Sequence, residues 1–324
     1  MKLHIIGIYM MHDITIAILY TPSELTPWKE NINLETIQSI EENLPSHITS
    51  TRVEFSGFNH QDAIYLRQFD IVLNLCYGYL DANQVDIALW LESYNIVHTG
   101  SHHEAMRIAQ DKSTLPRICE RLGCKTPFIP NLESMIDDNK TYVEKPRFGS
   151  CHRNISILTP VQAKEKLMKQ TDDILIQEYI HGREFSVAVI PDIKGDYYEA
   201  LNPVEIYPKS NHEIYIAGNG YVQTEKTFSP NISHEHLSEV KEIALKIHGY
   251  LGLSFMSRTD MRMDSENRIF ILDINTLPNL DPNRSLLPRI CKNQGISLKV
   301  LLERIVSMAM KKRSKSDLVF NELQ

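Results

Sequence analysis

Residues Ser257–Pro288 read SRTDMRMDSENRIFILDINTLPNLDPNRSLLP and contain two short strand patterns separated by a polar turn. Side chains repeat every two residues along a strand, so Arg258 and Asp260 share one face of the first strand. The apolar run RIFILDIN ends in Asp273 and Asn275, which also lie two positions apart. The stretch therefore predicts two adjacent antiparallel strands that carry oxygen-bearing side chains at matching ends.

Asp260, Asp273 and Asn275 together offer hard oxygen atoms of the kind that Mg²⁺ prefers. Mg²⁺ usually keeps few protein ligands and takes the others from phosphates and water. A single aspartate at a strand end is most often only solvated, but acids that end two strands at matched spacing favour a metal site. We therefore predict that these three residues bind magnesium.

The composition is that of an ordinary globular protein, with 42% hydrophobic and 23% charged residues among 324. This length allows two or three units with their own cores. The net charge of −7 argues against a nucleic-acid partner, because a phosphate backbone requires a basic surface. The five cysteines form no CxxC pair, which indicates reduced thiols and a cytoplasmic location.

Two further classes of feature are not expected. No stretch reaches the ~18 uninterrupted apolar residues that a membrane span requires, and the polar residues within 1–20 favour a buried first strand over a signal peptide. The thirteen histidines show no metal-ligand spacing, and His102-His103 is predicted to lie at the surface. We expect a protein with no membrane partner and no histidine metal site.

The first hundred residues alternate strand and helix patterns, which predict a doubly wound α/β layer with a parallel sheet. Ligands of such folds collect at the carboxyl ends of strands, here after Gly7 and in the loop that contains Tyr77. The predicted strands cover 3–8, 51–58, 69–78 and 95–100, and the predicted helices cover 33–44 and 84–94.

The rest of the chain carries further patterns around one long polar segment, 207–228, which is typical of a mobile functional loop. Pro160 begins one helix and Ser233 caps another. The predicted helices cover 112–123, 160–169, 233–251 and 297–310, and further strands are predicted within 141–158, 174–180 and 183–190.

The string KPRFGS at residues 145–150 places a lysine at a strand end before a short loop, an arrangement that can surround phosphates. It is not the GxxxxGK[ST] pattern of P-loop proteins, and alone it indicates only a surface turn. The nucleotide interpretation depends on residues further along the chain. Backbone groups of 176–180 could face an adenine edge, and Glu184 could reach ribose hydroxyls, while the predicted metal ligands hold the triphosphate.

The order of DK, KPxxGS, IQEYIxGREFSV, RTD, LDINTLPN and RSLLP resembles the ATP-grasp superfamily, and within it the D-alanine–D-alanine ligase group. The resemblance covers nearly the whole chain. It implies an ATP-grasp fold, mixed α and β in its nucleotide-binding part, preceded by the N-terminal α/β domain. The implied boundaries are 1–101 for that domain, 102–183 for the central lid domain and 184–324 for the catalytic domain.

The resemblance also implies a reaction. ATP phosphorylates a substrate carboxylate, and an amine then attacks the acyl phosphate through a tetrahedral intermediate. ATP would be bound by Lys112, Lys145, Glu178, Tyr179, Ile180 and Glu184. Two Mg²⁺ ions, or Mn²⁺ in their place, would be bound by Asp260, Asp273 and Asn275.

Further roles implied by the resemblance concern the two substrates, a small carboxylate and an amino acid. Arg258 would stabilise the tetrahedral oxyanion. Ser150 would belong to the amino-acid site, while Ser285 and Leu286 would hold the carboxylate of the amine substrate. Segment 207–228, with Tyr215, Tyr221 and Lys226, would close over the reaction and exclude water. A homodimer is expected from the resemblance.

The departures from the family pattern concern the first substrate. Met11, in the string MHDIT, stands where the family has the glutamate that receives the first substrate's amino group. The loop NLCYGYLDANQ, which contains Tyr77, replaces the family's HGxxGEDG. Arg147, His152 and Arg153 could meet a more acidic substrate or could simply be solvated. We therefore expect amide-ligase chemistry with a first substrate other than D-alanine.

Three alternatives stay open. The first is a D-alanine–D-alanine ligase of cell-wall synthesis. The second is a small-molecule kinase, which would release a stable phosphorylated product without an amine. The third is a nucleotide-binding regulatory protein without turnover, which is disfavoured because Arg258, Asp260, Asp273 and Asn275 are all present.

Overall fold

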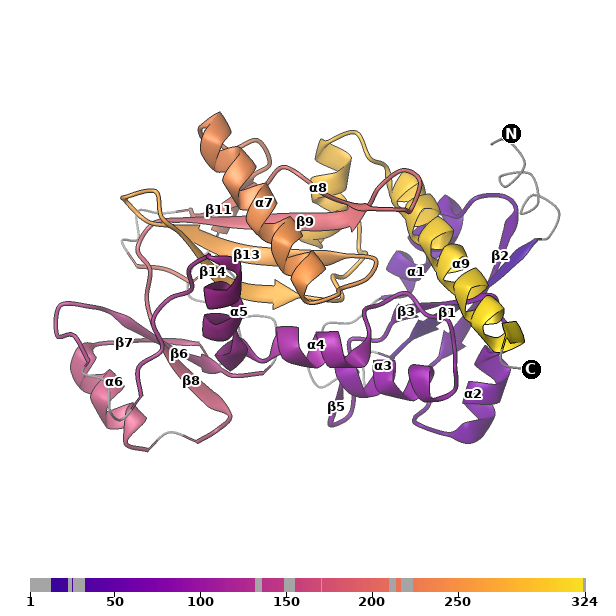
Figure 1. The fold of residues 1–324 in the computed structure, drawn as a ribbon, viewed down its shortest axis with the longest axis horizontal. Coiled ribbons are helices and arrows are strands. Elements are labelled where there is room, and N and C mark those ends of the chain that lie inside the picture. The colour runs from indigo at the N-terminus through magenta and orange to yellow at the C-terminus, as the bar shows by residue number, and fades with distance from the viewer. Residues whose placement is uncertain are drawn as a thin grey trace. The chain divides into compact units, whose positions relative to one another are not determined.

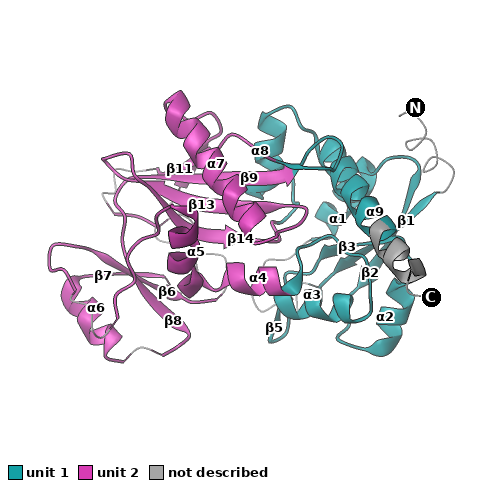
Figure 2. Ribbon diagram, in the orientation of Figure 1, with its two compact units in different colours: residues 1–103, 191–198, 279–324 teal, residues 104–190, 199–278 magenta. Residues whose placement is uncertain are grey.

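The computed structural model of the chain describes residues 13–22, 25, 33–131, 136–148, 155–169, 171–209, 214–216 and 224–322, with side chains of the last helix up to 314. Contacts divide the chain into two compact units, shown in Figure 2. Unit 1 comprises 1–103, 191–198 and 279–324, and unit 2 comprises 104–190 and 199–278. No helix among the described residues is both long enough and apolar enough to span a membrane.

Unit 1 contains the predicted parallel sheet, in the order β2-β1-β3 (Figure 1). Its core combines strand residues such as Leu19 and Val72 with Ile87, Trp90 and Leu91 of a helix. The helix predicted at 84–94 is confirmed and begins with a capping box between Asn83 and Asp86. The elements are β1 (Ile14–Tyr20), α1 (Leu34–Asn43), β2 (Ile48–Glu54), α2 (His60–Leu66), β3 (Ile71–Leu75), β4 (Gly78–Tyr79), β5 (Ala82–Asn83), α3 (Gln84–Ser93), α8 (Leu286–Asn293) and α9 (Leu298–Glu322).

The N-terminal strand differs from the prediction. The strand expected at 3–8 lies outside the described residues, and so does Met11. Ile14 and Thr15 belong to β1. The segment after β1 begins at Thr21, at the carboxyl edge where ligands of parallel sheets collect. The substrate-binding role of Met11 stays a prediction.

One other prediction for unit 1 needs correction. The strand predicted at 95–100 is reduced to one bridge between His98 and Val72. Further along the chain, Ser285 is the N-cap of α8.

Unit 2 is built on a six-stranded sheet in the order β12-β11-β9-β13-β14, with β10 paired to β9. Helix α7 crosses one face of this sheet in Figure 1, where Ile247 packs with Ile271 and Ile274 of β14. Leu115 and Cys119 of α5 complete this core. The elements are β9 (Arg183–Pro191), β10 (Tyr198–Ala200), β11 (Val204–Pro208), β12 (Thr224–Thr227), α7 (His234–Tyr250), β13 (Ser257–Met263) and β14 (Ile269–Asn275).

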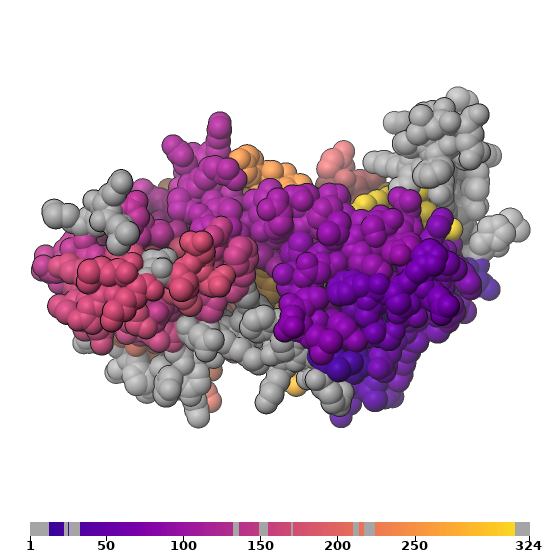
Figure 3. All heavy atoms as spheres, turned by 90° about the horizontal axis from the view of Figure 1, so that it is seen from below, coloured from indigo at the N-terminus to yellow at the C-terminus, as the bar shows by residue number. Residues whose placement is uncertain are grey.

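A smaller three-stranded antiparallel sheet, β7-β6-β8, also belongs to unit 2. Tyr142 and Ile176 pack against Ala163 and Leu167 of α6, and Thr159 and Gln162 form a capping box at the start of that helix. Residues of this sheet and helix form one continuous patch at the surface in Figure 3. The elements are β6 (Tyr142–Pro146), β7 (Ser156–Leu158), α6 (Pro160–Leu167) and β8 (Ile174–Glu178).

The helix predicted at 112–123 is interrupted near its start. Residues Lys112–Thr114 form a 3-10 turn, and α5 (Leu115–Leu122) follows it, while α4 (His103–Gln110) precedes it. Pro116 has no N–H to donate to the carbonyl of Lys112, so a continuous α-helix cannot begin there. The turn fixes Lys112 in a buried position.

Candidate active site

The predicted antiparallel pairing of the two strands that carry the metal ligands is confirmed. In β13 and β14, Asp260 lies opposite Asp273, and Arg258 lies opposite Asn275. The register shifts between Asp260 and Met261, an irregularity of the kind found where strands re-aim side chains next to sites. All four polar side chains are half-buried at one end of the strand pair.

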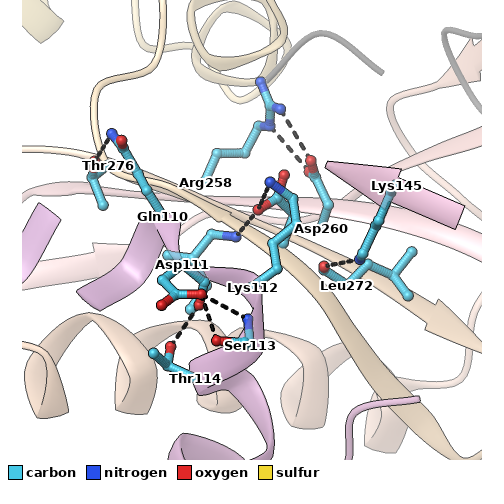
Figure 4. A network of polar contacts seen from close by, with 12 residues as sticks. Gln110, Asp111, Lys112, Ser113, Thr114, Lys145, Arg258, Asp260, Leu272 and Thr276 are labelled. Carbon is cyan, nitrogen blue, oxygen red and sulfur yellow. Dashed lines mark hydrogen bonds and ion pairs between the residues drawn. The ribbon is translucent and has the colours of Figure 1, made fainter. Parts of the chain in front are cut away.

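Arg258 and Asp260 contact each other directly in this structure (Figure 4). Arg258 Nε and Nη2 donate to the two carboxylate oxygens of Asp260, each at 3.0 Å. Ser186 Oγ of β9 also donates to Asp260 Oδ1. The bidentate contact places a guanidinium beside the predicted metal ligand and fixes the orientation of both groups.

Two lysines from distant parts of the chain lie at the same end of β14 (Figure 4). Lys112 Nζ lies 3.6 Å from Asp273 Oδ1, and Lys145 Nζ donates to the carbonyl oxygen of Leu272 at 3.2 Å. Lys145 is only 7% exposed. Burial, and secondly the nearby Lys112 cation, lower the pKa of Lys145 to about 8, against a smaller opposite effect of Asp273.

The turn that carries Lys112 is held by Asp111 and Arg147. Asp111 Oδ1 accepts from the N–H and hydroxyl groups of Ser113. Arg147 Nε and Nη2 donate to Asp111 at 2.7 and 2.6 Å, and Lys112 N–H donates to the carbonyl of Arg147. Arg147 therefore links the end of β6 to the Lys112 turn and neutralises Asp111. This structural role is additional to the substrate contact that was considered for Arg147 from the sequence. Ser150, His152 and Arg153 lie outside the described residues.

The residues predicted to bind adenosine already have charged partners. Glu178 pairs with Lys140 at 3.0 Å. Glu184 is buried and accepts from Arg262 Nε at 3.1 Å and Nη2 at 2.8 Å. The ribose role predicted for Glu184 must therefore compete with a buried ion pair.

Arg262 lies at the same site and was not predicted from the sequence. Its guanidinium lies over the rings of Tyr179, at 4.6 Å, and Tyr215, at 4.7 Å. It also donates to the backbone carbonyls of Ile180 and Tyr215 at 2.9 and 2.7 Å. A signal was present, because Arg262 continues the alternation that places Arg258 and Asp260 on one face.

Tyr215 is fixed by hydrogen bonds as well as by this stacking. Tyr179 Oη donates to the Tyr215 carbonyl at 2.7 Å and accepts from the Tyr215 N–H at 2.8 Å, while Tyr215 Oη donates to the Ile206 carbonyl. Burial raises the pKa of Tyr215 above its ordinary range. This part of the segment predicted to be a mobile loop is thus packed against β8 and β11.

Comparison with known proteins shows which family the chain resembles. Residues 156–307 match the family model described as D-ala D-ala ligase C-terminus. The chain is similar to the D-alanine–D-alanine ligases of the ATP-grasp superfamily. A D-alanine–D-alanine ligase of Aquifex aeolicus is 29% identical over 227 residues, which are 67% of this chain and 75% of that protein. The corresponding ligase of Pelagibacter ubique is 28% identical over 74% of this chain and 81% of that protein.

Solved structures of this family share the fold. The D-alanine–D-alanine ligase of Bacillus anthracis complexed with ATP aligns with a TM-score of 0.71 at 20% identity, covering 94% of this chain and 99% of that one. The VanG D-Ala:D-Ser ligase of Enterococcus faecalis aligns with a TM-score of 0.71 at 17% identity, covering 92% and 100% of the two chains. The predicted ATP-grasp fold is therefore confirmed.

The residues of the strand pair fit the predicted magnesium. Asp260, Asp273 and Asn275 supply only oxygen donors on their partly buried side chains. Hard oxygen ligands are those that Mg²⁺ requires, and the neighbouring Lys112 and Lys145 suit the phosphates that complete its shell.

The remaining predicted site residues lie elsewhere. Lys226 is not in a loop but in β12, opposite Ile206 of β11. In unit 1, Tyr77 is buried just after β3, Leu286 is the first residue of α8, and the Ser285 side chain makes no capping hydrogen bond. The substrate roles of Tyr77, Ser285 and Leu286 stay predictions, and Tyr221 lies outside the described residues.

Proposed function

We propose that this protein is an ATP-dependent carboxylate–amine ligase that forms an amide bond through an acyl phosphate. One observation carries the proposal, namely that two lysines are buried beside the predicted magnesium ligands. A buried ammonium is costly without a negative partner, and Lys145 contacts a neutral carbonyl in the described structure. A polyphosphate would supply the missing negative charge at this position.

The residues of the strand end would perform distinct steps. Lys112 and Lys145 bind and orient the terminal phosphates, so that a carboxylate oxygen attacks the γ-phosphorus as the bond to ADP breaks. Bound Mg²⁺ would neutralise charge on the phosphates. The amine nitrogen then attacks the acyl carbon, loses its proton, and inorganic phosphate leaves. Arg258 stabilises the oxyanion that develops at that carbon.

The nucleoside end must rearrange for this reaction. Adenine and ribose would need the Ile180 carbonyl and the Glu184 carboxylate, which Arg262 contacts in this structure. Nucleotide binding would therefore move the Arg262 guanidinium or stack the base on it, because a cation over a π-system is favourable.

The first substrate is the finer part of the proposal. The loop NLCYGYLDANQ after β3 still departs from the family pattern and supports a carboxylate other than D-alanine. Met11, where the family pattern has a glutamate, supports the same choice. The relatives named D-alanine–D-alanine ligase make D-alanine the first substrate to test.

One assay separates these possibilities. ADP release is measured with Mg²⁺ and ATP for D-alanine alone and for a panel of acid and amine pairs, and mass spectrometry identifies the product from a pooled mixture. Robust turnover with D-alanine alone would exclude the specialised substrate. A stable phosphorylated product without an amine would show a kinase instead. Sedimentation of the purified chain tests the expected homodimer.

A further inference from the structure

Unit 1 contains a cluster of three histidines around one carboxylate, which the proposed ligase reaction does not use. His98 Nε2 lies 3.4 Å from Glu92 Oε1, and His102 Nε2 lies 3.1 Å from Glu92 Oε2. His103 Nδ1 lies 2.5 Å from the same Oε2. Ligand atoms of Glu92, His102 and His103 all lie within 4.8 Å of one another. The histidines show no metal-ligand spacing in the sequence, yet the fold brings these four residues together.

The burial of the His98 side chain is a second observation about this cluster. The side chain is buried at 2% exposure, its Nε2 lies 3.4 Å from Glu92 Oε1, and its Nδ1 has no hydrogen-bond partner among the described residues. A buried polar group without a partner calls for a bound water or ion.

We propose that Glu92, His102 and His103 bind one divalent transition-metal ion of the Zn²⁺ class, with water as its further ligand. Neutral imidazole and carboxylate are the ligands that Zn²⁺ takes in proteins. Bond lengths of about 2.0–2.2 Å in a tetrahedral site separate neighbouring donor atoms by roughly 3.3 Å. The contact of His102 with Glu92, at 3.1 Å, lies close to this spacing. The exposed His102, at 59%, leaves the ion a path from solvent.

Glu92 also has a structural role that must be distinguished from metal binding. Its Oε1 accepts from the His103 N–H at 3.0 Å, which caps the start of α4. Burial opposes ionisation, but contacts with the His98 and His103 rings and the His103 backbone lower the pKa of Glu92 to about 2. A capping carboxylate explains the contact with His103. Capping of α4 does not explain why the imidazoles of His98 and His102 also contact the Glu92 carboxylate.

The charge of the neighbouring Lys312 should affect the affinity for a metal ion in a predictable direction. Lys312 of α9 interacts electrostatically with Glu92, and its charge also acts on His98. A metal ion would be repelled by this ammonium. Replacement Lys312→Met should therefore strengthen metal binding.

The experiment is a calorimetric titration of the metal-stripped full chain, with Zn²⁺ as the only titrant. The buffer contains excess Mg²⁺, which occupies sites that consist of oxygen ligands. We expect one equivalent to bind, and His102→Gln to lower the affinity at least about tenfold. His102 is exposed, so this variant should fold normally. The matched control is His236→Gln, because His236 pairs with Glu239 at 3.3 Å on an exposed face of α7.

An independent readout is the visible absorption of the Co²⁺-substituted chain, which reports tetrahedral nitrogen and oxygen ligation, together with the rise in Tm on metal binding. Loss of both signals in His102→Gln but not in His236→Gln supports the site. Absence of a Zn²⁺ equivalent in the wild type, or equal affinity in the two variants, overturns it. Neither readout depends on ligase activity, so failure here is distinguishable from failure of the proposed function.

Discussion

The two ends of the predicted nucleotide site differ in how their charges are balanced. At the phosphate end, Lys112 is 3.6 Å from the nearest carboxylate oxygen of Asp273, and Lys145 donates to a carbonyl. At the nucleoside end, Glu184 and Arg262 form a buried ion pair with two hydrogen bonds. Both ends lie in unit 2, and both use buried charged side chains.

The difference shows which end depends on a ligand. The buried Lys145 cation, which donates to a neutral carbonyl, makes the protein less stable until an anion arrives, so the phosphate end gains most from binding. The buried pair at the nucleoside end is already satisfied and loses contacts when a ligand replaces one partner. We therefore expect substitutions at the phosphate end to change catalysis, and substitutions at the nucleoside end to change stability.

The largest expected effect is on turnover in Asp273→Ala and Arg258→Ala. Removal of a metal ligand or of the cation that faces the oxyanion should lower the rate of ADP release on the order of 10³-fold, which corresponds to about 4 kcal/mol. A coupled ADP assay measures this change, with circular dichroism to confirm folding. The control is Glu266→Ala, in the exposed turn of the same hairpin. Unchanged rates in both site variants would refute the site assignment.

The second prediction concerns stability at the nucleoside end. Arg262→Met leaves Glu184 buried without its partner, which should cost roughly 3–5 kcal/mol of unfolding free energy. Arg183→Met is the matched control, because the Arg183–Glu205 pair is partly exposed and should contribute about 0–1 kcal/mol. Urea unfolding of both variants without nucleotide gives the comparison. Equal losses would show that the buried pair is not special.

The third prediction is a pH dependence from Lys145. Its folded-state pKa of about 8 lies below the ordinary 10.5, so the unfolded chain holds more protons between these values. Without ligand, this group makes the protein more stable as pH rises from about 8 to 10.5. ATP binding requires the protonated form, so affinity should fall by up to about tenfold per pH unit above 8. Lys145→Arg should flatten the profile of KM for ATP, and an unchanged slope would contradict the assignment.

The smallest effect is expected for Glu178→Gln. Glu178 is paired with Lys140, whose side chain is partly exposed, and such pairs contribute about 0–1 kcal/mol. The KM for ATP should change by less than about fivefold. Lys140→Met, which removes the other partner of the pair, should change the KM for ATP by a similarly small factor. A loss as large as that of Asp273→Ala would mean that Glu178 contacts the nucleotide directly and that the two ends are more alike than their charges indicate.

Much of the site was predictable because its residues lie close in sequence. Arg258, Asp260, Asp273 and Asn275 belong to one hairpin, and a period of two fixes which side chains share a face. The strands, the polar turn between them and their antiparallel pairing all follow from this local pattern. Lys112 and Lys145 were predicted by resemblance, since nothing in their own neighbourhood specifies burial beside Asp273.

The errors arose where alignment or distant packing mattered. No strand was predicted over Ile14–Tyr20, yet β1 lies there and is the central strand of the parallel sheet. Lys226 was predicted in a loop, but β12 adds it to the edge of the six-stranded sheet. A short polar run such as TEKT gains its strand structure from pairing with β11, and pairing across a long connection leaves little trace in local composition.

The sequence by itself determined the period-two hairpin and the capped helices, because each of these depends on neighbours within a few residues. The order of motifs along the chain gave the family resemblance. Only the tertiary structure decided that Arg262 pairs with Glu184, 78 positions away, and lies between Tyr179 and Tyr215. It also decided that three histidines without metal spacing meet at Glu92. Contacts between buried charges depend on which surfaces the fold brings together, and local periodicity carries no record of that choice.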